Sequence, residues 1–194
     1  MSAKLFLLLV LWPKSSLNSN KSIFGKISFI QQKYGQCCYR CCLLTVDFSV
    51  WQSALGPLRV NSAAVNAGAL AEGAKLVIIT SQAGSCEWRT TQNANEGGDY
   101  GHHMSRAACN IAGVLQAEEL RGKGYSVILL HPGFNRTEMT AKYKEIWDVE
   151  GAVEPKIGAK RVLYEAIKSS LETTGQSISM GLRSERKYTS ITMA

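Results

Sequence analysis

Residues 75–80, Lys-Leu-Val-Ile-Ile-Thr, are the stretch of sequence that decides the fold of this chain. A short run of apolar, mostly β-branched residues without alternation is typical of a parallel strand that is covered on both faces. A second run of this kind, Tyr-Ser-Val-Ile-Leu-Leu, occupies residues 125–130. Because a helical pattern separates the two runs, the sequence predicts a βαβ unit with a right-handed crossover.

Helical patterns surround both predicted strands. We expect helices over 46–70, 100–121, 138–147 and 154–171, and a last strand over 176–180. This alternation predicts an α/β fold with a parallel sheet. In such sheets ligands bind at the carboxyl ends of the strands, so we expect the functional residues in the loops that follow Thr80 and Leu130.

The chain has a net charge of +7, and nearly all of this excess lies in residues 1–46. That segment holds six basic residues and no acidic one, which leaves 16 basic (22 − 6) and 15 acidic residues in 47–194. The predicted α/β part is therefore close to neutral. Its composition gives no reason to expect a nucleic-acid-binding face.

The sequence divides into an irregular leader (1–46), an α/β domain (47–182) and a polar tail (183–194). In the leader Lys4 precedes an apolar run, 5–12, that is too short to span a bilayer as a helix. Three interpretations stay open: a secretory signal, an organellar transit peptide, and a segment without a targeting role. We expect a cytoplasmic protein unless one of the first two holds.

Four of the six cysteines lie together in residues 37–42, where Cys38 and Cys41 have the Cys-x-x-Cys spacing of a zinc or redox motif. A structural zinc site needs four ligands, and no second pair of this kind follows. Cys86 and Cys109 stand alone in the sequence. We therefore expect no metal ion, and reduced thiols in an intracellular protein.

Four segments, 54–60, 79–85, 100–110 and 131–139, carry a resemblance to one protein family. Ile-Thr-Ser-Gln-Ala-Gly-Ser at 79–85 resembles a strand end that carries a catalytic serine. The segment 100–110 resembles the helix start that carries Tyr-x-x-x-Lys, and His-Pro-Gly at 131–133 resembles a loop that reaches nicotinamide. With order and spacing kept over about 47–182, the chain resembles the short-chain dehydrogenase/reductase family, in its C-factor-like (sniffer-like) branch.

The resemblance implies a partial Rossmann-like, doubly wound parallel sheet and an NAD(P)-dependent oxidoreductase that acts on a carbonyl/alcohol pair. The family serine falls on Ser81, its tyrosine on His102 and its lysine on Arg106, while the asparagine of the preceding helix falls on Ser53. We expect Ser81 to polarise the carbonyl, His102 to transfer the proton and Arg106 to hold the ribose hydroxyls. The residues expected to contact the cofactor, NAD or NADP, are Pro132, Gly133, Phe134, Thr137 and Arg106.

The glycine-rich turn with which the family holds the pyrophosphate has no counterpart in residues 1–46, where Gly25 and Gly35 are isolated. Because the backbone N–H donors of that turn are missing, we expect weak or absent cofactor binding. Three hypotheses follow: an oxidoreductase, a catalytically inactive remnant that acts as a dimerising partner, and a piece of a longer enzyme. The substrate and the choice between NAD and NADP are not encoded in these motifs.

The resemblance also implies a homodimer, because the family helices that match 46–70 and 100–121 form the subunit interface. The apolar or small residues on these helices are Ala63, Ala64, Ala67, Leu70, Ala107, Ile111, Val114 and Leu115. The alternative is that these faces only pack against the sheet.

Asn135-Arg136-Thr137 also matches a glycosylation acceptor, which we interpret as coincidence because it lies in the predicted cofactor loop.

Overall fold

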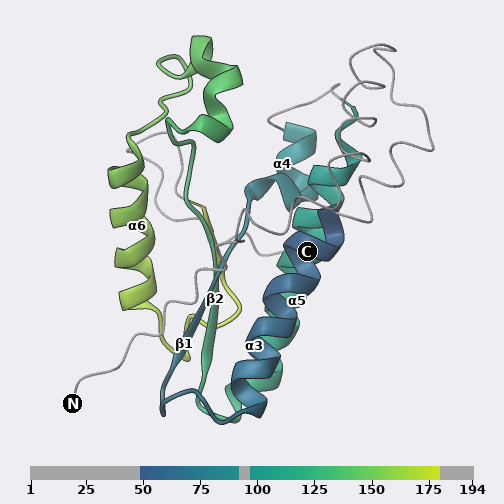
Figure 1. Ribbon diagram of the computed structural model, residues 1–194, viewed down its shortest axis with the longest axis vertical. Helices are drawn as coiled ribbons and strands as arrows, with labels where there is room; N and C mark the ends of the chain where they lie inside the picture. The colour runs from purple at the N-terminus through teal and green to yellow at the C-terminus, as the bar shows by residue number, and fades with distance from the viewer. Residues whose placement is uncertain (1–48, 92–96, 180–194) are drawn as a thin grey trace, which may run out of the picture.

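The computed structural model describes residues 49–91 and 97–179 (Figure 1). The predicted leader, the cysteine cluster at 37–42 and the polar tail lie outside these residues. In chain order the elements are η2 (Trp51–Leu55), α3 (Gly56–Asn66), β1 (Lys75–Ile79), η3 (Gln82–Gly84), α4 (Cys86–Thr91), α5 (Tyr100–Arg121), β2 (Ser126–His131), η4 (Glu138–Ile146), α6 (Pro155–Lys168) and β3 (Ser177–Ser179). None of the helices described is long and apolar enough to cross a bilayer.

The described strands form one parallel sheet in the order β1-β2-β3. Leu76 lies opposite Val127, and Leu130 lies opposite Ile178. Helices α3 and α5 cover one face of this sheet and α6 covers the other (Figure 1). The predicted α/β fold with parallel strands is confirmed, and the crossover from β1 to β2 runs through α5.

Successive residues of β1 and β2 face opposite helical layers, which explains why both strands lack alternation in the sequence. One buried cluster joins Leu76, Ile78 and Val127 to Cys109, Ala117 and Leu120 of α5. The other joins Val77, Ile128 and Leu130 to Ala166 of α6. Every residue in these two clusters is at most 6% exposed, so the apolar runs make up the core of the described part.

Helix boundaries differ from the sequence prediction for identifiable reasons. The predicted helix 46–70 ends at Asn66. It also contains a π-helical turn, η2, in which the N–H of Gly56 bonds back to the Trp51 carbonyl, and the next residue, Pro57, has no N–H to donate. The predicted helix 138–147 is a 3₁₀ segment, η4, interrupted at Tyr143 (φ −111°, ψ 22°). The predicted loop 81–99 also contains two short helices, η3 and α4.

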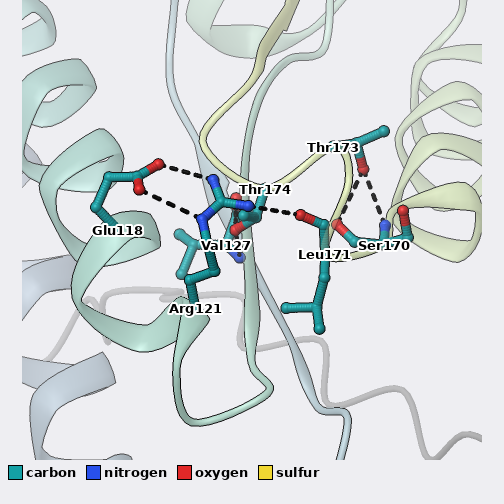
Figure 2. A network of polar contacts seen from close by, with 7 residues as sticks. All are labelled: Glu118, Arg121, Val127, Ser170, Leu171, Thr173 and Thr174. Carbon is teal, nitrogen blue, oxygen red and sulfur yellow. Dashed lines mark hydrogen bonds and ion pairs between the residues drawn. The ribbon is translucent and has the colours of Figure 1, made fainter.

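Polar contacts fix the amino end of β2 to the connection between α6 and β3 (Figure 2). The Val127 N–H donates to Thr174 Oγ1 at 2.8 Å, and Arg121 donates to the Leu171 carbonyl at 2.8 Å. Arg121 also pairs with Glu118 at 2.7 Å. These contacts hold α5, β2 and the segment before β3 together at the end of the sheet opposite to the loops after Thr80 and His131.

Candidate active site

The carboxyl ends of β1 and β2 lie side by side, as the sequence predicts. Beyond β1 the strand ladder continues, since the Thr80 N–H donates to the Leu130 carbonyl at 2.9 Å. Ser81 therefore leaves the sheet at the edge where His131 ends β2. This edge is where an open parallel sheet places ligands.

Ser81 begins the short 3₁₀ turn η3 and caps it. Its Oγ accepts a hydrogen bond from the Ala83 N–H at 3.1 Å, and the residue is half-buried. A hydroxyl that accepts one such bond still has its own proton to donate. Capping the turn and polarising a carbonyl are therefore compatible roles for this side chain.

The turn η3 packs directly on the first turns of α5, and glycine is required at the contact. A Cβ added to Gly84 would lie 2.5 Å from the Arg106 carbonyl carbon and 2.5 Å from the Ala107 nitrogen. His103 reinforces the contact, because its ring Nδ1 lies 2.8 Å from the Ala83 carbonyl oxygen. The first turns of α5 are thus held against the turn that Ser81 begins.

His102 and Arg106 lie one helical turn apart on α5, as their spacing predicts. His102 is partly exposed, and its ring makes an edge contact with that of His103, with 5.5 Å between the centroids. Tyr100, the other aromatic residue at this helix start, is 58% exposed. Ser53, at the position of the family asparagine, is half-buried in η2.

Two buried polar residues, Thr80 and Asn110, hold α5 to the end of β1. Thr80 Oγ1 donates to Asn110 Oδ1 at 2.5 Å, and Asn110 Nδ2 donates to the Ser81 carbonyl at 3.5 Å. Both residues are at most 4% exposed. The sequence motifs did not single out either residue, because a buried hydrogen bond across 30 positions leaves no local pattern.

Burial governs the protonation of both His102 and His131. Partial burial lowers the pKa of His102 below 6.5; the Asp99 carboxylate raises this pKa and the Arg106 guanidinium lowers it. The pKa of His131 is lowered to about 4, mainly by deeper burial. A hydrogen bond to the Thr80 backbone raises this pKa, and the charge of Arg106 lowers it. Both imidazoles are therefore neutral at pH 7.

The segment after β2 folds back on itself around Asn135. Asn135 Nδ2 donates to the carbonyls of Pro132 (3.1 Å) and Gly133 (3.0 Å). A Cβ added to Gly158 of α6 would lie 2.0 Å from Asn135 Oδ1, so the amide is wedged against the helix. The side-chain nitrogen of Asn135 is therefore engaged with the backbone of the turn that follows β2.

Lowering the pH below neutral is expected to destabilise the protein through His131. An unfolded histidine titrates near pH 6.5, and folded His131 titrates at about 4. The unfolded chain therefore takes up a proton first, so the contribution to stability is complete above pH 6.5 and is lost as the pH falls toward 4. By pH 5 the loss amounts to about 2 kcal/mol of unfolding free energy.

Urea unfolding of the natural protein and of His131→Gln at pH 7 and pH 5 checks this prediction. The difference between the two proteins isolates His131, because the carboxylates titrate equally in both. The variant is expected to lose less stability on acidification. Parallel losses in the two proteins would show that His131 is not protected from protonation.

Comparisons with known proteins find two sequence relatives. No family model matches the chain. C-signal of Myxococcus xanthus is 40% identical over 89 residues, which are 45% of this chain and 49% of that protein. The 1-hydroxy-2-glutathionyl-2-methyl-3-butene dehydrogenase of Rhodococcus sp. (strain AD45) is 34% identical over 122 residues, which are 63% of this chain and 50% of that protein.

Solved structures share the fold of the chain. Carbonyl reductase Sniffer of D. melanogaster superposes with a TM-score of 0.56 at 14% identity, over 88% of this chain and 74% of that one. Sniffer of Caenorhabditis elegans gives a TM-score of 0.52 at 14% identity, over 84% and 72%. The chain is thus similar in sequence to C-signal and to a dehydrogenase, and it shares the fold of the two Sniffer structures. It spans about half the length of the two sequence relatives that it matches.

Apart from Arg106, the residues that the sequence predicts to contact the cofactor lie after β2. The turn after β2 carries Pro132 and Gly133, the latter at φ 79°, and Thr137 caps the segment that follows. Among residues 49–91 and 97–179 no group of three or more His, Cys, Asp or Glu residues lies close enough to hold a metal ion.

Proposed function

We propose that this chain forms the carbonyl-binding part of an NAD(P)-dependent oxidoreductase that interconverts a carbonyl and an alcohol. The observation that carries the proposal is the packing of the Ser81 turn on the helix that carries His102 and Arg106, at the sheet edge where Pro132 follows β2. Sequence similarity supports it, since one relative is named as a dehydrogenase of a hydroxy compound.

In the proposed mechanism, Ser81 donates its hydroxyl proton in a hydrogen bond to the carbonyl oxygen. His102 takes up or delivers the proton of the alcohol, and Arg106 holds the ribose hydroxyls. Pro132, Gly133, Phe134 and Thr137 would hold NAD(P), which would supply or accept the hydride. Because the pKa of His102 is lowered, its neutral imidazole can accept the proton of an alcohol at pH 7.

A second function, a dimerising partner without catalysis, is favoured by the outer face of α5. Met104, Ile111 and Leu115 lie on this face and are 50%, 50% and 63% exposed. The buried face of the helix, with Cys109, is turned toward the sheet. Large exposed apolar residues that line up at helical spacing are typical of an interface, so we propose a homodimer through α3 and α5.

The proposal extends to a cytoplasmic location. Cys86 and Cys109 are free thiols, as reducing compartments favour.

NAD(P)H fluorescence titration, together with sedimentation velocity of the full chain, discriminates the two functions. Millimolar NADH or NADPH binding by a dimer supports the oxidoreductase, with weak affinity expected because no phosphate-binding turn is identified. A dimer that does not bind either cofactor supports the non-catalytic partner. A monomer without cofactor binding contradicts both functions.

A further inference from the structure

The outer edge of β1 has no strand beside it among residues 49–91 and 97–179. The order of the sheet is β1-β2-β3, so β1 is paired on one side only. Leu76, Val77 and Ile78 are nevertheless 1%, 6% and 4% exposed. Edge strands usually carry charged side chains that keep other chains from pairing with them. The charged residue of β1, Lys75, instead donates to the Ile167 carbonyl of α6 at 2.5 Å, so its ammonium is directed to the helix and does not guard the edge.

Three residues of β1 direct their backbone groups to this edge. The Thr80 N–H donates to the Leu130 carbonyl at 2.9 Å, so the even-numbered residues of the strand face β2. Consecutive residues of a strand point their N–H and C=O groups to opposite sides. The N–H and C=O groups of Lys75, Val77 and Ile79 therefore point away from β2, toward the outer edge.

Val77 has the greatest need for a partner at this edge. It is 6% exposed, so water has little access to its N–H and C=O groups. No hydrogen bond from the described residues reaches either group. Buried backbone groups in native proteins are nearly always paired. A strand added beside β1 would supply both bonds, and it would also meet the outward groups of Lys75 and Ile79.

We infer that residues 22–30 of this chain, Ser-Ile-Phe-Gly-Lys-Ile-Ser-Phe-Ile, add to the outer edge of β1 as a further strand. Five of these nine residues are isoleucine or phenylalanine, which favour strands. The apolar run at 5–12 is mostly leucine, which favours helices. Lys26 lies in the middle of 22–30, where its charge would protect the new edge from further pairing.

The connection to the described part begins near β1 and is long enough. Val50 packs against the buried cluster that contains Leu76 and Ile78, so the chain enters the described fold close to β1. Eighteen residues (48 − 30) separate Ile30 from Ser49. When extended they span about 60 Å, whereas β1 is only about 17 Å long. A tethered segment also has an effective concentration in the millimolar range, which a second copy of the chain does not reach in dilute solution.

Amide hydrogen exchange of the full chain, resolved by residue with NMR, tests the inference. The outward amides of Val77 and Ile79 are expected to exchange within about tenfold of the rates of Leu76 and Ile78, which are bonded to β2. This protection is expected to stay the same when the protein is diluted about tenfold, because the added strand belongs to the same chain.

Proline substitutions at two neighbouring positions assign the protection to 22–30. Proline has no N–H, and consecutive N–H groups of a strand point to opposite sides, so one of Ile27→Pro and Ser28→Pro removes a bond to β1. That variant is expected to raise the exchange rate of Val77 by about tenfold or more. The amides bonded to β2 are expected to stay protected, which shows that the sheet is folded. Gln36→Pro, in the connection after 22–30, is the matched control and is expected to leave Val77 unchanged.

Fast exchange of Val77 and Ile79 in the natural protein would show that the edge is open, and it overturns the inference. Protection that is lost on dilution also overturns it, because the occupant would then be a second copy of the chain. So does protection that survives both Ile27→Pro and Ser28→Pro, because another segment would then cover β1. None of these outcomes involves a cofactor or a substrate, so the inference stands or fails independently of the proposed function.

Discussion

Ser81→Ala is expected to lower kcat for carbonyl/alcohol interconversion by about 100-fold or more, the usual effect of removing a hydrogen-bond donor from the reacting oxygen. The hydroxyl is free to donate, because its bond to the Ala83 N–H uses it only as an acceptor. Cofactor affinity is expected to stay unchanged, since Ser81 is not among the proposed cofactor contacts. Turnover and NAD(P)H titration of the same preparation check both parts.

Ser85→Ala is the matched control for the loss of a capping hydroxyl. Ser85 Oγ accepts from the Trp88 N–H at 3.2 Å, much as Ser81 Oγ does in its own turn, but Ser85 lies beyond η3. Each variant is expected to lose about 1 kcal/mol of stability, typical of a lost cap. If Ser85→Ala slowed turnover as much as Ser81→Ala, the effect would come from the turn and not from the hydroxyl.

Gly84→Ala is expected to reduce the free energy of unfolding by about 3 kcal/mol, at the upper end of the usual cost of overpacking. The added methyl group would meet backbone atoms of Arg106 and Ala107 at 2.5 Å, and the hydrogen-bonded backbone of a helix does not move aside as a side chain does. This steric clash is removed only if α5 shifts away from η3. The variant is therefore also expected to lose any ligand binding that depends on Ser81 and Arg106 together.

Gly122→Ala provides the control for the glycine-to-alanine change itself. Gly122 ends α5 with an ordinary helical conformation (φ −65°), and a Cβ there would have no atom within 4 Å. It is expected to leave stability unchanged or to raise it by about 0.4–1 kcal/mol, because the unfolded chain loses freedom. Urea unfolding measures both variants, and equal stability of Gly84→Ala and the natural protein would show that η3 and α5 are not in contact.

The sequence predicts the sheet well because its signal is local. The runs at 75–80 and 125–130 were predicted as buried parallel strands, and both are. The helix 100–121 was predicted with its bounds, because its start at Tyr100 and its end before Gly122 follow from residues at those positions. The 3₁₀ character of η4 was missed, because the interruption at Tyr143 has no sequence signature.

The site was predicted only in part. Ser81, His102 and Arg106 were found through motif positions, and their roles stay predictions. His103 and His131 were not among the predicted site residues, although both lie in segments, 100–110 and 131–139, that carry the family resemblance. Only the fold shows that His103 contacts the Ala83 carbonyl and that His131 is buried enough to lower its pKa to about 4.

By itself, the sequence determined the strand runs, the helix between them and the order of the site segments, because apolar periodicity and glycine or proline positions act over a few residues. The tertiary structure decided which polar groups meet. Thr80 reaches Asn110 across 30 positions, and the backbone of Gly84 touches that of Arg106. Such contacts depend on how α5 lies on the sheet, which is fixed by the packing of the whole core rather than by any local pattern.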